Sequence, residues 1–215
     1  PHNFIRKLKF KAFLPFIIIF ALVTGIEIWG EQLYHGEGGQ TLILFCSKPL
    51  LMPILMVLLV RTTHLRTSFD KLIFAGFVFA WIGDVLLMFN SDDLFVFGLA
   101  AFLICHILYI IAFVKNIRSS GHKSSLVNRI ILALLPIFYL IVLYTYLYPY
   151  IVNDPKNQPF LIPVTVNAIT IVTMSLFALW RFGSSNRNST ILVIVGAFIF
   201  MISDSLIALN KFVSP

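Results

Sequence analysis

The chain has 215 residues, of which 59% are hydrophobic and only 12% are charged, and its mean hydropathy is +0.94. This composition excludes a soluble domain, which must cover its surface with polar groups, whereas in lipid only helices and closed barrels satisfy every backbone hydrogen bond. The formal net charge of +7 is compatible with a nucleic-acid partner, but the positions of the charges along the chain argue against one.

Apolar runs of about 20 residues recur along the chain, without the strict alternation of barrel strands, and this pattern predicts transmembrane helices. The connecting loops are short, so neighbouring helices are expected to be antiparallel. We therefore predict an all-α, polytopic transmembrane helix bundle that forms a single integral membrane domain over residues 1–215. The seven predicted spans cover residues 12–30, 41–60, 70–89, 93–115, 128–150, 158–181 and 189–210.

The basic residues sort by side of the predicted membrane. Thirteen of the 16 lysines and arginines lie in the N-terminal segment or in the loops after spans two, four and six. The opposite side holds only Lys156 and Lys211, and Lys48 lies inside a span. By the positive-inside rule the N-terminus is cytoplasmic and the odd-numbered spans run outward. The basic charge therefore reflects topology, and no nucleic-acid partner is expected.

A few ionisable side chains lie inside the predicted spans. Each costs roughly 2.5–3.5 kcal/mol on insertion scales, so each is a candidate functional group. A rise of about 1.5 Å per residue places most of them at similar depth in the outer half of the membrane. We predict a polar cavity open toward the outer side, with His106 near the midplane as its floor. The candidates are Glu27, Lys48, Asp84, His106 and Asp204, with Asn167 and Tyr109 as neutral companions.

These side chains also have structural interpretations. His106 could be a hydrogen-bonded packing residue, Glu27 could be solvated at the interface, and Lys48 could extend toward the surface. Asp84 and Asp204 could form a buried cluster with Lys48, but their matching depth on separate spans favours a functional role. The sequence has no HExxH zinc motif, G-x-S-x-G nucleophile motif or phosphate-binding glycine loop, so no metal ion or cofactor is expected.

Several segments resemble motifs of the YhhN-type membrane proteins, the lysoplasmalogenase family. Their order and spacing together make the resemblance specific, and they cover spans two, three, four and seven. Proteins of this family are expected to have eight spans, so an eighth is expected beyond Pro215. The segments are Ser47–Leu50, Ile82–Leu87, Phe97–Leu99, Phe102–Tyr109, Gly196–Ser205 and Ile207–Phe212.

The resemblance implies an enzyme, a membrane hydrolase that cleaves the vinyl-ether bond of lysoplasmalogens. The products are a fatty aldehyde and a glycerophospho-base (choline or ethanolamine), and the partners are the lysophospholipid substrate and membrane lipid. Cleavage of an enol ether begins with protonation of the distal alkene carbon and passes through an oxocarbenium ion that water captures. Asp84 and Asp204 are expected to share the roles of acid and of cation stabiliser or base, in either order.

His106 could orient a carboxylate or the attacking water. The expected substrate-binding residues are Lys48 for the phosphate, Trp81 or Glu27 for the head-group cation, and Tyr109 and Asn167.

Two other functions use the same residues. A small proton-coupled transporter or channel would relay protons through buried Asp, His and Lys side chains, although no internal repeat supports it. A diaspartyl protease would share the aspartates, but Trp81 stands where its first motif glycine is expected. The identity of the acid, the head-group and chain-length preference and the oligomeric state are left open by the sequence.

Overall fold

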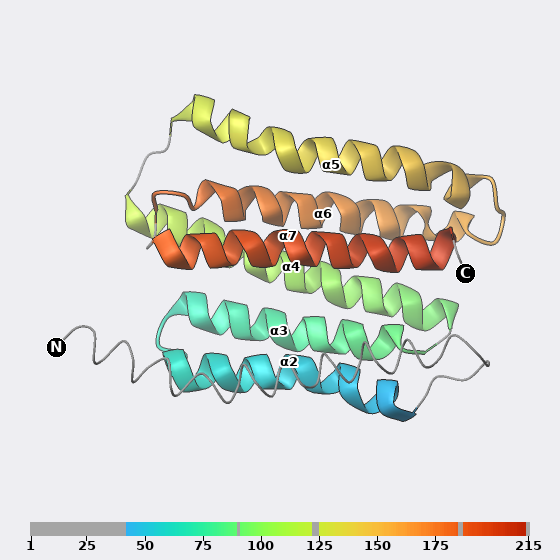
Figure 1. The fold of residues 1–215 in the computed structure, drawn as a ribbon, viewed down its shortest axis with the longest axis horizontal. Helices are drawn as coiled ribbons and strands as arrows, with labels where there is room; N and C mark the ends of the chain where they lie inside the picture. The colour runs from blue at the N-terminus through green and yellow to red at the C-terminus, as the bar shows by residue number, and fades with distance from the viewer. Residues whose placement is uncertain (1–41, 90, 122–124, 185–186, 214–215) are drawn as a thin grey trace. The chain divides into compact units, whose positions relative to one another are not determined.

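The structure is a computed structural model that describes residues 42–89, 91–121, 125–184 and 187–213 (Figure 1). This part of the chain is all-α, as predicted. It contains α2 (Leu42–Thr63), α3 (Ser68–Leu87), α4 (Asp92–Ser120), α5 (Leu126–Val152), the 3-10 helix η1 (Gln158–Phe160), α6 (Leu161–Trp180) and α7 (Arg187–Phe212).

The helices coincide with predicted spans two to seven. Among the described residues, four segments are long and apolar enough to cross a membrane: α4, α5, η1 with α6, and α7. The 20 residues of α3 include the charged Asp70, Lys71 and Asp84. The predicted span at residues 12–30 lies outside the described residues, so the total of seven spans stays a prediction.

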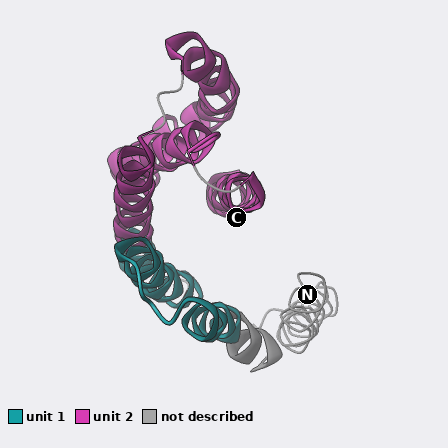
Figure 2. Cartoon of the chain, turned by 90° about the vertical axis from the view of Figure 1, so that its left-hand side faces the viewer, with its two compact units in different colours: residues 1–98 teal, residues 99–215 magenta. Residues whose placement is uncertain are grey.

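The chain divides into two units, residues 1–98 and residues 99–215, whose described parts are coloured teal and magenta in Figure 2. The boundary falls inside α4, between Gly98 and Leu99. The single-domain organisation that the sequence predicts stays a prediction.

In the first unit, α2 packs against α3. The start of α3 is fixed by a capping box, in which the Thr67 hydroxyl accepts a hydrogen bond from the Asp70 amide at 3.1 Å. In return, the Asp70 carboxylate accepts from the Thr67 amide at 3.0 Å, so two backbone donors at the helix end are satisfied. Gly76, Ala80 and Gly83 form a buried face of α3 with small side chains, which allows close packing of helices in lipid.

In the second unit, α6 packs against both α5 and α7, and polar side chains join the helices. The Tyr139 hydroxyl on α5 donates to Ser205 Oγ on α7 at 2.7 Å. Tyr144 on α5 and Thr165 on α6 share a hydrogen bond of 2.9 Å. A hydrogen bond between two helices fixes the rotation of each helix about its own axis. These two bonds therefore define which faces of α5, α6 and α7 meet.

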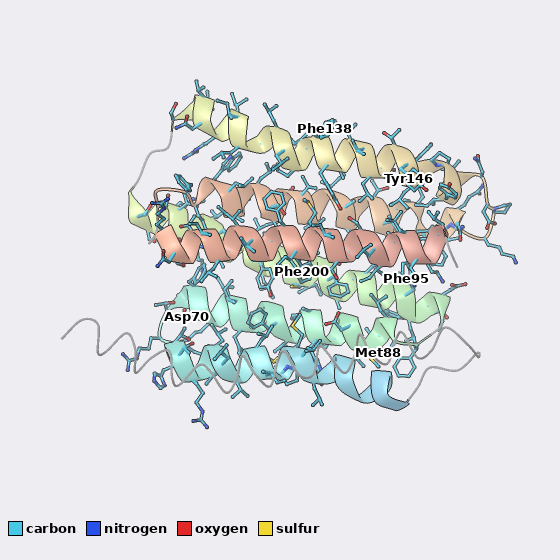
Figure 3. All side chains as sticks on the ribbon, viewed as in Figure 1. Asp70, Met88, Phe95, Phe138, Tyr146 and Phe200 are labelled. Carbon is cyan, nitrogen blue, oxygen red and sulfur yellow. The ribbon has the colours of Figure 1, made fainter. Side chains whose placement is uncertain are left out.

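The outer surface of α5 is apolar and aromatic. Phe138 is 66% exposed and Tyr146 is 51% exposed, and Figure 3 labels both side chains. Exposed apolar residues along a whole helix are what lipid contact requires. The composition and packing of α5 therefore agree with a membrane-embedded bundle.

Candidate functional site

One of the two predicted catalytic aspartates, Asp84, lies on α3 in the first unit. It directly follows Gly83 on the tightly packed part of that helix, and its side chain is half-buried. Trp81 lies one turn earlier, and its indole N–H donates to the Pro49 carbonyl of α2 at 2.8 Å.

The hydrogen bond of Trp81 follows from the sequence of α2. Pro53 lies four residues after Pro49, and proline has no N–H to donate to the carbonyl of residue i−4. The Pro49 carbonyl is therefore left without its helical partner, and the indole of α3 replaces it. This contact holds the backbone of Pro49, the residue after Lys48, against the segment of α3 that carries Asp84. The side chain of Lys48 lies outside the described residues.

The other predicted aspartate, Asp204, lies on α7 in the second unit. Its Oδ2 accepts a hydrogen bond from Asn167 Nδ2 of α6, with a donor–acceptor distance of 3.3 Å. Asn167 is only 5% exposed, whereas Asp204 is half-buried. The sequence placed Asn167 and Asp204 at similar depth on different spans, and the structure brings them into contact.

His106 is fully buried on α4, among aromatic rings. The Phe200 ring of α7 meets it edge-on with ring centroids 5.0 Å apart, and the Phe102 ring lies parallel to it at 6.5 Å (Phe200 is labelled in Figure 3). Its polar neighbour is the Asn167 amide. Among the described residues, neither ring nitrogen of His106 nor Asn167 Oδ1 reaches a partner in hydrogen-bond geometry.

The second unit thus assembles Asp204, Asn167 and His106 from three helices. A buried polar atom that is left unpaired costs free energy, so such atoms in native proteins commonly mark a position for water or a polar ligand. The unpaired atoms of His106 and Asn167 beside one carboxylate can hold a water molecule or a substrate hydroxyl, which needs two to four polar partners. The site therefore offers hydrogen-bond acceptors and donors in an otherwise apolar interior.

Two predicted site residues remain, Tyr109 and Glu27. Tyr109 is 8% exposed and stacks on Phe113 with ring centroids 6.3 Å apart. Glu27 lies outside the described residues. In the described part of the chain, no group of three or more His, Cys, Asp or Glu side chains is arranged to hold a metal ion.

Two features of the site were not predicted from the sequence. Phe200, which packs on His106, lies four residues before Asp204, so both are on one face of α7, and that spacing was a usable signal. The Trp81–Pro49 contact was also signalled, by two prolines four residues apart inside one apolar helix.

The long apolar helices and their polar contacts define a multi-pass integral membrane protein. The chain belongs to the YhhN family, which residues 43–215 match. Similar proteins include lysoplasmalogenase TMEM86A of Bos taurus, which is 32% identical over 144 residues, and lysoplasmalogenase TMEM86A of Homo sapiens, which is 31% identical over 144 residues. Each match covers 66% of this chain and 55% of the relative, so the chain spans about half the length of the curated relatives it matches. No solved structure is significantly similar to the chain.

Proposed function

We propose that this protein is a lysoplasmalogenase that hydrolyses the vinyl-ether bond of a lysophospholipid. The observation that carries the proposal is the Asp204–Asn167 pair beside buried His106, in a chain of the YhhN family that is similar to two proteins named lysoplasmalogenase. The identity of 32% supports the reaction class and leaves the head group open.

The proposed chemistry needs one carboxylic acid and one carboxylate. The acid gives its proton to the distal alkene carbon, and the adjacent carbon becomes part of an oxocarbenium ion. Water adds to this cation and loses a proton to the base, and the resulting hemiacetal breaks down to the fatty aldehyde and the free glycerol hydroxyl. Glycosidases divide an oxocarbenium reaction between two carboxyl groups in a comparable way.

We assign the carboxylate role to Asp204. An N–H donor such as that of Asn167 stabilises the ionised form of a carboxyl group. Asp84 is then the acid that protonates the alkene carbon. Lys48 is proposed to pair with the substrate phosphate.

His106 and Asn167 complete the proposed site around Asp204. Asn167, which the sequence suggested as a substrate-binding residue, acts here as a positioning residue that holds the Asp204 carboxylate through its Nδ2. The Asn167 amide and the His106 ring are neighbours, and Asn167 Oδ1 and the ring nitrogens are proposed to orient the attacking water. Trp81, Glu27 and Tyr109 remain candidates for contacts with the head group and the alkenyl chain.

The test is the release of aldehyde by the purified protein from a 1-alkenyl lysophospholipid, with the 1-acyl analogue as the substrate control. Asp84→Asn and Asp204→Asn keep the size of each side chain and remove its ionisable group. Each should lower kcat by about 10²–10⁴-fold, the usual contribution of general acid–base catalysis.

A matched control is Asp154→Asn, which removes an exposed carboxylate from the loop between α5 and α6, where it accepts a hydrogen bond from the Lys156 amide. This variant should keep full activity. Lys48→Met should raise KM more than it lowers kcat. Absence of aldehyde from the unmodified protein would refute the proposed reaction, and full activity in both aspartate variants would refute the assigned roles.

A further inference from the structure

One end of the second unit gathers polar side chains that the proposed hydrolysis does not use. Here the end of α4, the start of α5, the end of α6 and the start of α7 meet. We call this group the basic end; its residues are Asn116, Arg129, Arg181, Ser184 and Thr190.

Arg181 is the most deeply buried cation of the group. Its side chain is 1% exposed, although it follows the last residue of α6. Its Nε donates to Asn116 Oδ1 of α4 at 3.0 Å, and its guanidinium lies over the Phe113 ring at 5.4 Å. Burial lowers the pKa of Arg181 from its ordinary value, but an arginine side chain in a protein stays charged. The structure thus fixes a positive charge among the helix ends.

Arg129 brings a second cation to the same end. Its guanidinium lies over the Trp180 ring at 5.9 Å, and its carbonyl accepts a hydrogen bond from the Trp180 indole at 3.1 Å. Trp180 immediately precedes Arg181, so the contacts of these two neighbours tie α4, α5 and α6 together at this end.

Three buried donors of the basic end have no hydrogen-bond partner among the described residues. They are Arg129 Nε, Ser184 Oγ and Thr190 Oγ1, and Thr190 is 1% exposed. The Ser184 amide donates to the Arg181 carbonyl at 2.8 Å, which places Ser184 directly at the end of α6. Donors that remain unpaired in a buried position favour a ligand that is rich in acceptor oxygens.

The charge of the second unit points to an anion. Residues 99–215 contain only two acidic residues, Asp154 and Asp204. Asp154 follows the end of α5 and precedes the start of α6, so it lies at the other end of these two helices from the basic end. Asp204 lies 17 residues beyond Arg187, or about 26 Å along α7 from the basic end. The start of α7 adds the partial positive charge of a helix N-terminus.

We propose that the basic end binds a phosphate group, supplied by an anionic phospholipid head group at the membrane surface or by phosphate in solution. A phosphate offers several acceptor oxygens and a negative charge, which match two guanidinium groups and two hydroxyl donors. The ends of membrane-spanning helices lie at the depth of lipid head groups, and anionic lipids attract basic residues there. This inference is independent of the proposed hydrolysis and involves none of its residues.

The test measures binding of phosphatidylglycerol to the purified full chain in detergent micelles by native mass spectrometry. Phosphatidylcholine and diacylglycerol, which carries no phosphate, serve as comparison lipids, and inorganic phosphate is added as a competitor. Phosphatidylglycerol should bind more tightly than diacylglycerol. Displacement by inorganic phosphate identifies a site for free phosphate, and binding that resists it identifies a head-group site; either outcome supports a phosphate site.

Two variants and two matched controls locate the site. Arg129→Gln and Thr190→Val should each weaken binding about tenfold, because each removes a donor to an anion. Thr190→Val keeps the side-chain volume and breaks no hydrogen bond within the described residues, so it should fold normally. The controls are Arg118→Gln, an exposed cation of α4, and Thr170→Val, a half-buried threonine of α6 whose hydroxyl donates to the Val166 carbonyl.

Binding that is unchanged in Arg129→Gln and Thr190→Val overturns the proposal. Equal losses in Arg118→Gln and Arg129→Gln, with no loss in Thr190→Val, overturn it as well, because they indicate attraction by overall charge.

Discussion

The hydrogen bond from Trp81 to the Pro49 carbonyl can be tested because the sequence supplies its cause. Trp81→Phe removes the indole N–H and leaves this carbonyl unpaired, since Pro53 cannot donate to it. Lipid offers no water to replace the lost donor, so the unpaired carbonyl should cost about 1–3 kcal/mol. The smaller ring also loses packing contacts, so the single variant cannot separate the two effects.

A double-mutant cycle with Pro53→Ala separates them. Alanine at position 53 supplies an N–H four residues after Pro49, so the carbonyl regains its helical partner. In this background Trp81→Phe should lose only packing, and the two changes should couple by about 1–2 kcal/mol. Unfolding free energies of the four proteins in mixed micelles give this coupling. Additivity within about 0.3–0.5 kcal/mol would show that the carbonyl does not depend on the indole.

Two further predictions concern helix packing and the carboxylate. A methyl group on Gly98 would lie 2.8 Å from Leu87 Cδ2, so Gly98→Ala should lower the unfolding free energy by about 1–3 kcal/mol. A methyl group on Gly196 would meet nothing within 4 Å. Gly196→Ala should therefore leave the unfolding free energy equal or raise it by up to about 1 kcal/mol. Equal effects in the two alanine variants would contradict this packing argument. Asn167→Leu removes the donor that holds the Asp204 carboxylate, so kcat should fall by about tenfold while KM changes little. An unchanged kcat with a lower unfolding free energy would mean that Asn167 has only a structural role.

The positions of the helices could be predicted from the sequence because lipid imposes both length and apolarity. The predicted span at residues 189–210 became α7 at Arg187–Phe212, and the predicted span at residues 128–150 became α5 at Leu126–Val152. The ends shifted by about two residues, because hydropathy reports the depth of a residue and caps decide where a helix stops.

The contacts within the candidate site were predicted less completely. Counting residues gives the position of a side chain along its helix axis, but the direction in which it points depends on how the helices rotate and pack. The sequence therefore placed Asn167 and Asp204 at one depth without showing that they form a hydrogen bond. The burial of Arg181 was not predicted from the sequence; Asn116 supplies an acceptor for its Nε and Phe113 an aromatic face for its guanidinium.

The bond between Asn167 and Asp204 also has a consequence for the biogenesis of the protein. Asp204 is the only acidic residue of α7, and a carboxylate inside an inserting helix costs roughly 2.5–3.5 kcal/mol. Chains emerge from the ribosome N-terminus first, so α6 and its amide are made before α7. The Asn167 amide of α6 is therefore already in place to donate a hydrogen bond to the Asp204 carboxylate when α7 inserts. A circular permutant in which α7 is translated before α6 should insert α7 less efficiently, and Asp204→Asn should restore its insertion.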